Sequence, residues 1–176
     1  EPTTSYLPLF FVLLLVSAIA LLMIKLRLVF LWQVWFLLSI FLTLLISLAA
    51  FTRTETVAII AAALFVAWRF FFPGAVIHNG TEVFIYGALA TVFTPLLTIV
   101  SVSILLILVS VYDYIAVRKT KHMITLARSQ GKARVFAGFV IPYGKHVAVL
   151  GGGDIGFPLI FAAVVNTQLG LGLFDW

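Results

Sequence analysis

The sequence contains no cysteine and very little charge. Without cysteine the chain has no disulfide framework, no thiol nucleophile and no thiolate metal site. Charged residues make up 10% of the 176 residues, whereas 64% are hydrophobic and the mean hydropathy is +1.23. Soluble domains average about 25% charged residues. The composition therefore excludes a water-soluble protein and predicts an integral membrane protein.

Histidine is also scarce, and its positions do not indicate a metal centre. His78, His122 and His146 are scattered, with no spacing typical of a ligand set. We expect neither a metal nor an organic cofactor. The net charge of +5 raises the question of nucleic-acid binding. No nucleic-acid partner is expected, because membrane topology accounts for the basic excess.

Apolar runs close to the roughly 20 residues that cross a bilayer occur along the whole chain. The run over 83–117 is too long for one span, and Pro95 and the Gly87 region are expected to divide it. The other runs cover 6–24, 28–51, 57–72 and 147–165. We predict about six membrane segments, with five or seven as alternatives. The fold class is an all-α, polytopic transmembrane helix bundle that forms a single domain over 1–176.

The basic residues are concentrated in one segment that contains no acidic residue. Seven of the eleven lie there: Arg118, Lys119, Lys121, Arg128, Lys132, Arg134 and Lys145. Short loops rich in Lys and Arg remain on the cytoplasmic side of a membrane. The sequence therefore predicts a cytoplasmic loop over 118–146.

A few polar residues near the ends of apolar runs are given structural interpretations. Arg69 is expected to extend its charged end to the membrane interface. Glu55 and Glu82 are expected to be solvated and to carry no chemistry. Asn79-Gly80-Thr81 matches a glycosylation pattern and is expected in an exposed loop.

Two aspartates lie inside apolar segments on either side of the basic loop. Asp113 and Asp154 would each cost several kcal/mol at membrane depth, so a function or a partner is expected for both. Two carboxylates held close at low dielectric do not both ionise, so one keeps its proton. The charged one can then activate water while the neutral one polarises a carbonyl. This pair predicts acid and base catalysis of amide hydrolysis.

The neighbours of the aspartates are candidate supporting residues. Gly151, Gly152 and Gly153 weaken a helix by roughly 1 kcal/mol each and permit close approach of another backbone, either of a substrate or of a packed helix. Pro158 removes a backbone donor from the same segment. Tyr112 points about 100° away from Asp113 on a helix, and it either flanks the substrate or packs against another helix.

These residues form two motifs. One is Tyr112-Asp113 followed by Thr120-Lys121-His122-Met123, and the other is Gly151-Gly152-Gly153-Asp154 followed by Ile155 and Pro158. They resemble the YD and GxGD motifs of the presenilin and signal peptide peptidase family of intramembrane aspartyl proteases, with archaeal presenilin homologues as the closest match. The resemblance implies that Asp113 and Asp154 are catalytic and that Tyr112, Gly151, Gly152 and Gly153 support them or contact the substrate.

The resemblance also implies an organisation and a set of partners. Residues 1–100 would be scaffold helices, and 101–176 would contain the catalytic helix pair with its basic loop. The expected partners are transmembrane-helix substrates and the lipid bilayer, and a homo-oligomer is an open alternative. The expected location is the cell membrane of a prokaryote.

Some features depart from the family pattern. The family's Pro-Ala-Leu motif on its ninth helix does not occur in the sequence, and fewer than five spans precede Asp113. We therefore expect the sequence to represent the family fold only up to about the seventh helix. The loop charge resembles presenilin topology, whereas Gly-Asp-Ile-x-x-Pro resembles signal peptide peptidase.

Two other functions remain alternatives at this stage. A secondary transporter can use intramembrane carboxylates beside a broken helix as proton or sodium sites, although it would favour internal repeats, which are not evident. Prepilin peptidases also use a GxGD motif, but the residues that surround it there differ from those in this chain.

Overall fold

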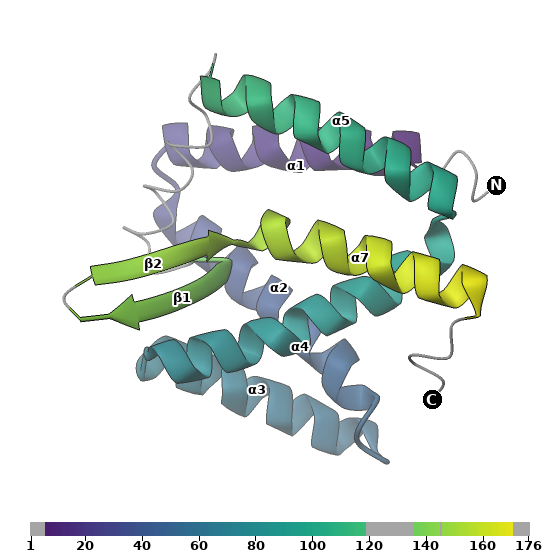
Figure 1. Cartoon of the computed structure of the whole chain (residues 1–176). Coiled ribbons are helices and arrows are strands. Elements are labelled where there is room, and N and C mark those ends of the chain that lie inside the picture. Colours follow the sequence, from purple (N-terminus) through teal and green to yellow (C-terminus); the bar gives the residue numbers. More distant parts are fainter. Residues whose placement is uncertain (1–5, 119–135, 145, 171–176) are drawn as a thin grey trace. The chain divides into compact units, whose positions relative to one another are not determined.

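The structure is a computed structural model in which residues 6–118, 136–144 and 146–170 are described. These ranges are mostly helical, which confirms the predicted fold class (Figure 1). The α-helices are α1 (Tyr6–Lys25), α2 (Val29–Ala49), α3 (Glu55–Phe71), α4 (Ala75–Phe93), α5 (Ile99–Arg118) and α7 (Gly152–Leu169). A 3₁₀ turn covers Thr94–Leu96, and an antiparallel hairpin is formed by β1 (Gly138–Tyr143) and β2 (His146–Gly151).

The breaks between helices follow local chemistry. Pro73 and Gly74 separate α3 from α4, and Pro95 lies in the 3₁₀ turn between α4 and α5, as predicted. The start of α5 is capped reciprocally. The Thr98 N–H donates to the Ser101 hydroxyl at 2.7 Å, and the Ser101 N–H donates to the Thr98 hydroxyl at 3.2 Å. Such a cap satisfies backbone donors that have no partner within the helix.

Three sequence predictions about elements are wrong. Gly87 lies inside α4 and does not divide the apolar run over 83–117. The polar patch over 78–82 also lies within α4, so Asn79-Gly80-Thr81 is not in an exposed loop. The expected last span does not begin at Val147, because the run from Val147 to Gly151 forms strand β2, and the helix starts only at Gly152.

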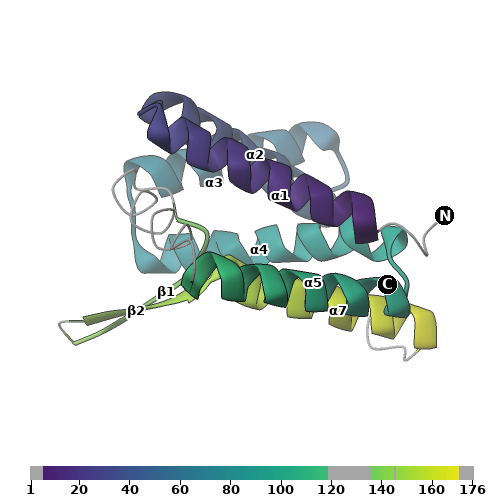
Figure 2. The same ribbon diagram turned by 90° about the horizontal axis from the view of Figure 1, so that it is seen from above.

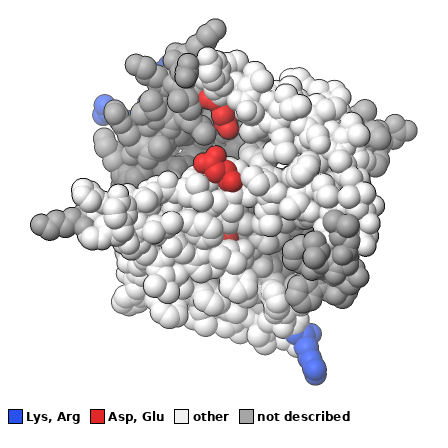
Figure 3. Space-filling view, in the orientation of Figure 1, with Lys and Arg blue, Asp and Glu red and all other residues white. Residues whose placement is uncertain are grey.

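The surface of the described residues is strongly apolar. Large side chains such as Phe30, Val100 and Phe11 are 78%, 68% and 64% exposed. On the face shown in Figure 3, charged side chains are few among the described residues. Within the described ranges, three helices are long and apolar enough to cross a membrane, over Tyr6–Met23, Val29–Ala49 and Ile99–Ala116. Exposed apolar surface on this scale is expected of a protein embedded in lipid.

The chain divides into two compact units. The first contains 1–34, 93–136 and 160–176, and in it α1 lies beside α5 (Figure 2). The second contains 35–92 and 137–159. Its core places Ile40, Leu44 and Leu48 of α2 against two small residues of α3, Ala58 and Ala62. Small side chains at such contacts allow helix backbones to approach closely.

Candidate functional site

Asp113 lies on the buried face of α5, in the first unit. Val102, Leu105, Val109 and Ala116 form a buried stripe along this helix at spacings of three, four and seven residues. Asp113 follows Val109 by four residues and precedes Ala116 by three, so it falls on the same stripe. Its side chain is half-buried. The spacing thus places Asp113 in line with the buried apolar residues of α5.

Tyr112 precedes Asp113 and is also half-buried. It follows Val109 by three residues, so it borders the same buried stripe. The packing against a neighbouring helix that the sequence allowed is consistent with this position. Whether Tyr112 also flanks a substrate stays a prediction.

Asp154 lies in the first turn of α7, in the second unit. The buried stripe of α7 consists of Gly156, Ile160 and Val164, and Asp154 points away from it and is exposed. The N-terminal end of a helix carries unpaired N–H groups and a partial positive charge, which stabilise a nearby carboxylate. Pro158 has no N–H and cannot donate to the carbonyl of Asp154, four residues earlier.

The three glycines before Asp154 mark the passage from strand to helix. Gly151 ends β2, and Gly152 and Gly153 begin α7. A Cβ at Gly152 would lie 2.9 Å from the Tyr86 hydroxyl and 3.4 Å from the Ala137 carbonyl oxygen. This crowding shows that other parts of the chain pack closely against Gly152. A substrate role for the glycines stays a prediction.

Gly151 and Gly153 differ from Gly152 in the space that is available for a side chain. A Cβ at Gly151 would lie 3.2 Å from an oxygen of Asp154, whereas a Cβ at Gly153 would meet only Phe157, at 3.8 Å. The carboxylate of Asp154 therefore folds back over Gly151. A side chain at position 151 would displace it, and one at position 153 would not.

The structure also shows a polar cluster between α3 and α4 that the sequence analysis missed. Arg69 is only 8% exposed, and its guanidinium donates to Glu82 at 2.6 Å and to the Thr81 hydroxyl at 2.7 Å. Glu82 is 1% exposed. The predictions that Arg69 reaches the interface and that Glu82 is solvated are therefore wrong. Each charge is satisfied by the other inside the protein.

The sequence does contain a signal for this cluster. Arg69 falls seven residues after Ala62, on the small-residue face of α3 that packs inward. On α4, Glu82 and Tyr86 recur at a spacing of four residues, which places them on one helical face. A basic and an acidic residue on two inward faces predict an ion pair.

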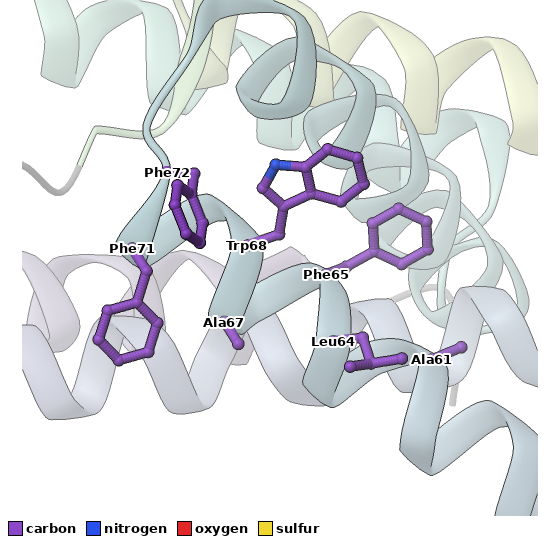
Figure 4. A pocket seen from close by; sticks show the side chains of 7 residues that line it. All are labelled: Ala61, Leu64, Phe65, Ala67, Trp68, Phe71 and Phe72. Carbon is purple, nitrogen blue, oxygen red and sulfur yellow. The ribbon is translucent and has the colours of Figure 1, made fainter.

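An apolar groove runs along α3 in the second unit (Figure 4). Its lining contains no acidic or basic side chain, so it offers no group for acid or base catalysis. The lining residues are Ala61, Leu64, Phe65, Ala67, Trp68, Phe71 and Phe72. Among the described residues, no three His, Cys, Asp or Glu side chains are grouped as a metal site would require.

Apolar spanning helices and two acidic residues on α5 and α7 define a polytopic membrane protein with ionisable groups in its helical segments. A protein-family comparison assigns it more specifically. The family described as "Signal-peptide peptidase, presenilin aspartyl protease" matches residues 4–166, and the chain belongs to this family. It is an intramembrane aspartyl protease, that is, an aspartic endopeptidase of membrane-protein substrates. Comparisons with curated proteins and with solved structures gave no match.

Family membership favours proteolysis over the transporter alternative. It does not by itself assign the catalytic residues. Tyr112 and Asp113 belong to the first unit, and Gly151 to Asp154 belong to the second. The pairing of the two aspartates is therefore a proposal.

Proposed function

We propose that Asp113 and Asp154 are the catalytic pair of this protease. The support is their order and context: a YD sequence on α5, a basic segment, and a GxGD sequence at the start of α7. One carboxylate would take a proton from the attacking water while the protonated one polarises the scissile carbonyl. As the tetrahedral intermediate collapses, the amine leaving group receives a proton from the pair. No covalent enzyme intermediate forms.

The hairpin provides a binding mode for the substrate. β1 covers one edge of β2, and backbone groups alternate in direction along a strand. Val147 and Val149 direct theirs away from β1, and both side chains are more than half exposed. No other strand among the described residues pairs with this edge. An unwound segment of a substrate helix can therefore add as a third strand beside Gly151, close to Asp154.

This mode satisfies the main physical requirement of intramembrane proteolysis. A scissile carbonyl within a regular helix is hydrogen-bonded and shielded by side chains, so the helix must open locally. In lipid, the backbone groups released by opening need new partners. The free edge of β2 supplies such partners to the opened segment. Gly151, Gly152 and Gly153 would contact the substrate at the end of this strand.

We also propose an orientation and a location. The segment 118–146 is cytoplasmic by its seven basic residues. Residues 1–100 serve as scaffold and 101–176 contain the catalytic helices. We further propose that the chain is related to archaeal presenilin homologues and lies in a prokaryotic cell membrane.

The test is cleavage of a labelled single-span membrane peptide by the full-length enzyme in detergent. Asp113→Ala and Asp154→Ala should each abolish cleavage, because each removes one member of the proton-transferring pair. Folding should change little, since each substitution also removes the cost of placing an acid in an apolar segment. Thr91→Val is the control, because the Thr91 hydroxyl donates to the Gly87 carbonyl oxygen of its own helix. Appreciable cleavage by either aspartate variant would show that the pair is misassigned.

A further inference from the structure

Three side chains of α4 occupy the outer edge of strand β1. The Asn79 amide donates to the Val140 carbonyl oxygen at 2.8 Å and accepts from the Val140 N–H at 2.9 Å. His78 Nε2 lies 2.8 Å from the Gly138 carbonyl oxygen. The second carboxylate oxygen of Glu82 accepts the Gly138 N–H at 3.2 Å. The inward backbone groups of the strand are left to pair with β2.

These contacts replace a neighbouring strand with side chains. An asparagine amide presents one donor and one acceptor, as a peptide group does, and it therefore completes both hydrogen bonds of Val140. Glu82 and His78 do the same jointly for Gly138. Pro142 is the next outward residue, and it has no N–H to satisfy. The outward N–H groups of β1 therefore have hydrogen-bond acceptors without a third strand.

The same helix contacts the start of α7. The Tyr86 hydroxyl lies against Gly152, and the Tyr86 ring meets Phe139 of β1 edge to face at 5.9 Å. The Gly152 N–H donates to the Ala137 carbonyl oxygen at 3.2 Å, which joins the first residue of α7 to the residue before β1. One face of α4 therefore fixes β1, and through it β2 and the first turn that carries Asp154.

We propose that Glu82, Asn79 and His78 are positioning residues that fix the register of the hairpin, and thereby the peptide bond that the protease cleaves. Arg69 contributes indirectly, because its ion pair holds one oxygen of Glu82 while the other binds Gly138. A substrate strand paired with β2 would be placed by this register relative to Asp154. The inference rests on the proposed catalytic role of Asp154.

The test compares products of the full-length enzyme, identified by mass spectrometry, on one single-span peptide. Asn79→Leu removes both hydrogen bonds to Val140. Arg69→Met with Glu82→Met removes the ion pair and the bond to Gly138. Arg69→Met with Glu82→Gln also removes both charges, but it keeps an oxygen that can accept the Gly138 N–H. Thr91→Val, on the same helix, is the control.

We expect Asn79→Leu and the double variant Arg69→Met with Glu82→Met (the Met/Met variant) to cleave at neighbouring bonds that the wild type leaves intact. Both should also lose roughly tenfold or more in kcat, with a smaller change in KM. Arg69→Met with Glu82→Gln (the Met/Gln variant) should give the wild-type products again, and Thr91→Val should keep them. Loss of stability alone would lower all products in equal proportion. Should the Met/Met variant not fold, Asn79→Leu carries the test.

Two results would count against different claims. Wild-type product proportions in Asn79→Leu, with or without a fall in melting temperature, would overturn the positioning role. Cleavage by Asp113→Ala or Asp154→Ala would instead overturn the assignment of the catalytic pair, on which the positioning role depends. Each aspartate variant is therefore assayed in parallel.

Discussion

Arg69 and Glu82 bury opposite charges between two helices, with side-chain exposures of 8% and 2%. The sequence suggests that these residues reach solvent, because each lies near the end of an apolar run. The structure satisfies them with each other and with Thr81 and Gly138. Removal of one partner from such a pair costs more than replacement of both, because the remaining charge stays buried and unpaired.

Arg69→Met should therefore lower the free energy of unfolding by about 3 kcal/mol or more, whereas Arg69→Met with Glu82→Gln should recover most of that loss. Thermal unfolding of the purified enzyme in detergent measures both. Thr43→Val serves as a control, because the Thr43 hydroxyl donates to backbone carbonyls of its own helix. Equal destabilisation by the single and double variants would contradict the buried pair.

Gly152 is the glycine of the motif with the least space. Gly152→Ala should lower activity and cost about 1–3 kcal/mol, because the new methyl group overlaps the Tyr86 hydroxyl. Tyr86→Phe removes that oxygen and should restore part of the activity when combined with it. Gly153→Ala is the matched control for stability, since its Cβ meets Phe157 only at ordinary contact distance. The melting temperatures of Gly152→Ala, the double variant and Gly153→Ala, and the activities of the first two, decide whether Tyr86 is the reason that position 152 requires glycine.

At the scale of elements, the junction between α4 and α5 leaves backbone groups without helical partners, and Gln168 of α7 binds two of them. Its Oε1 accepts the Ile99 N–H at 3.0 Å, and its Nε2 donates to the Leu97 carbonyl oxygen at 3.2 Å. Both contacts lie within the first unit. One side chain therefore joins the last turn of α7 to the first residue of α5.

Gln168→Leu should destabilise the enzyme by about 1–3 kcal/mol, because it removes a partner from each of two backbone groups. Gln168→Glu keeps an acceptor for the Ile99 N–H and should cost less. Melting temperatures of the two variants give the comparison. A leucine variant as stable as the wild type would mean that these groups find other partners.

The sequence predicts elements well where composition alone decides them. α1 and α2 lie within a few residues of the apolar runs over 6–24 and 28–51, and Pro95 separates α4 from α5. The hairpin was missed because Val147 to Gly151 is as apolar as a membrane helix, and only pairing with β1 makes it a strand. Short apolar runs do not distinguish strand from helix by periodicity.

The candidate site is predictable in part for the same kind of reason. Asp113 and Asp154 stand out in the sequence because charge is rare in apolar segments. The contacts of Glu82 and Asn79 with β1 join residues 56 and 61 positions apart, so they depend on tertiary structure. The side-chain roles in a polar patch cannot be assigned before its surroundings are known.

For the whole molecule, the distribution of charge supports the proposed orientation. Lys25 ends α1 and Arg27 follows before α2, and Arg118 ends α5 and is the first residue of the basic segment. If each of the first five helices crosses the membrane once, both basic regions lie on the same side. By the positive-inside rule, this common side supports the cytoplasmic location that we propose for the segment 118–146.

The absence of cysteine makes this orientation directly measurable. A single Ser129→Cys variant in inverted vesicles should react with a membrane-impermeant maleimide. A single Thr54→Cys variant, between α2 and α3, should react only in right-side-out vesicles or after detergent is added. The reverse labelling pattern would place the basic segment outside the cell.

β2 passes into α7 with no intervening linker, since Gly151 ends the strand and Gly152 begins the helix. A residue inserted between His146 and Asp154 would reverse the faces of the strand or turn the aspartate by about 100° around the helix axis. The number of residues between His146 and Asp154 is therefore fixed by the structure. In the proposed binding mode, the side chains that a substrate meets along β2 can vary, but their number is fixed.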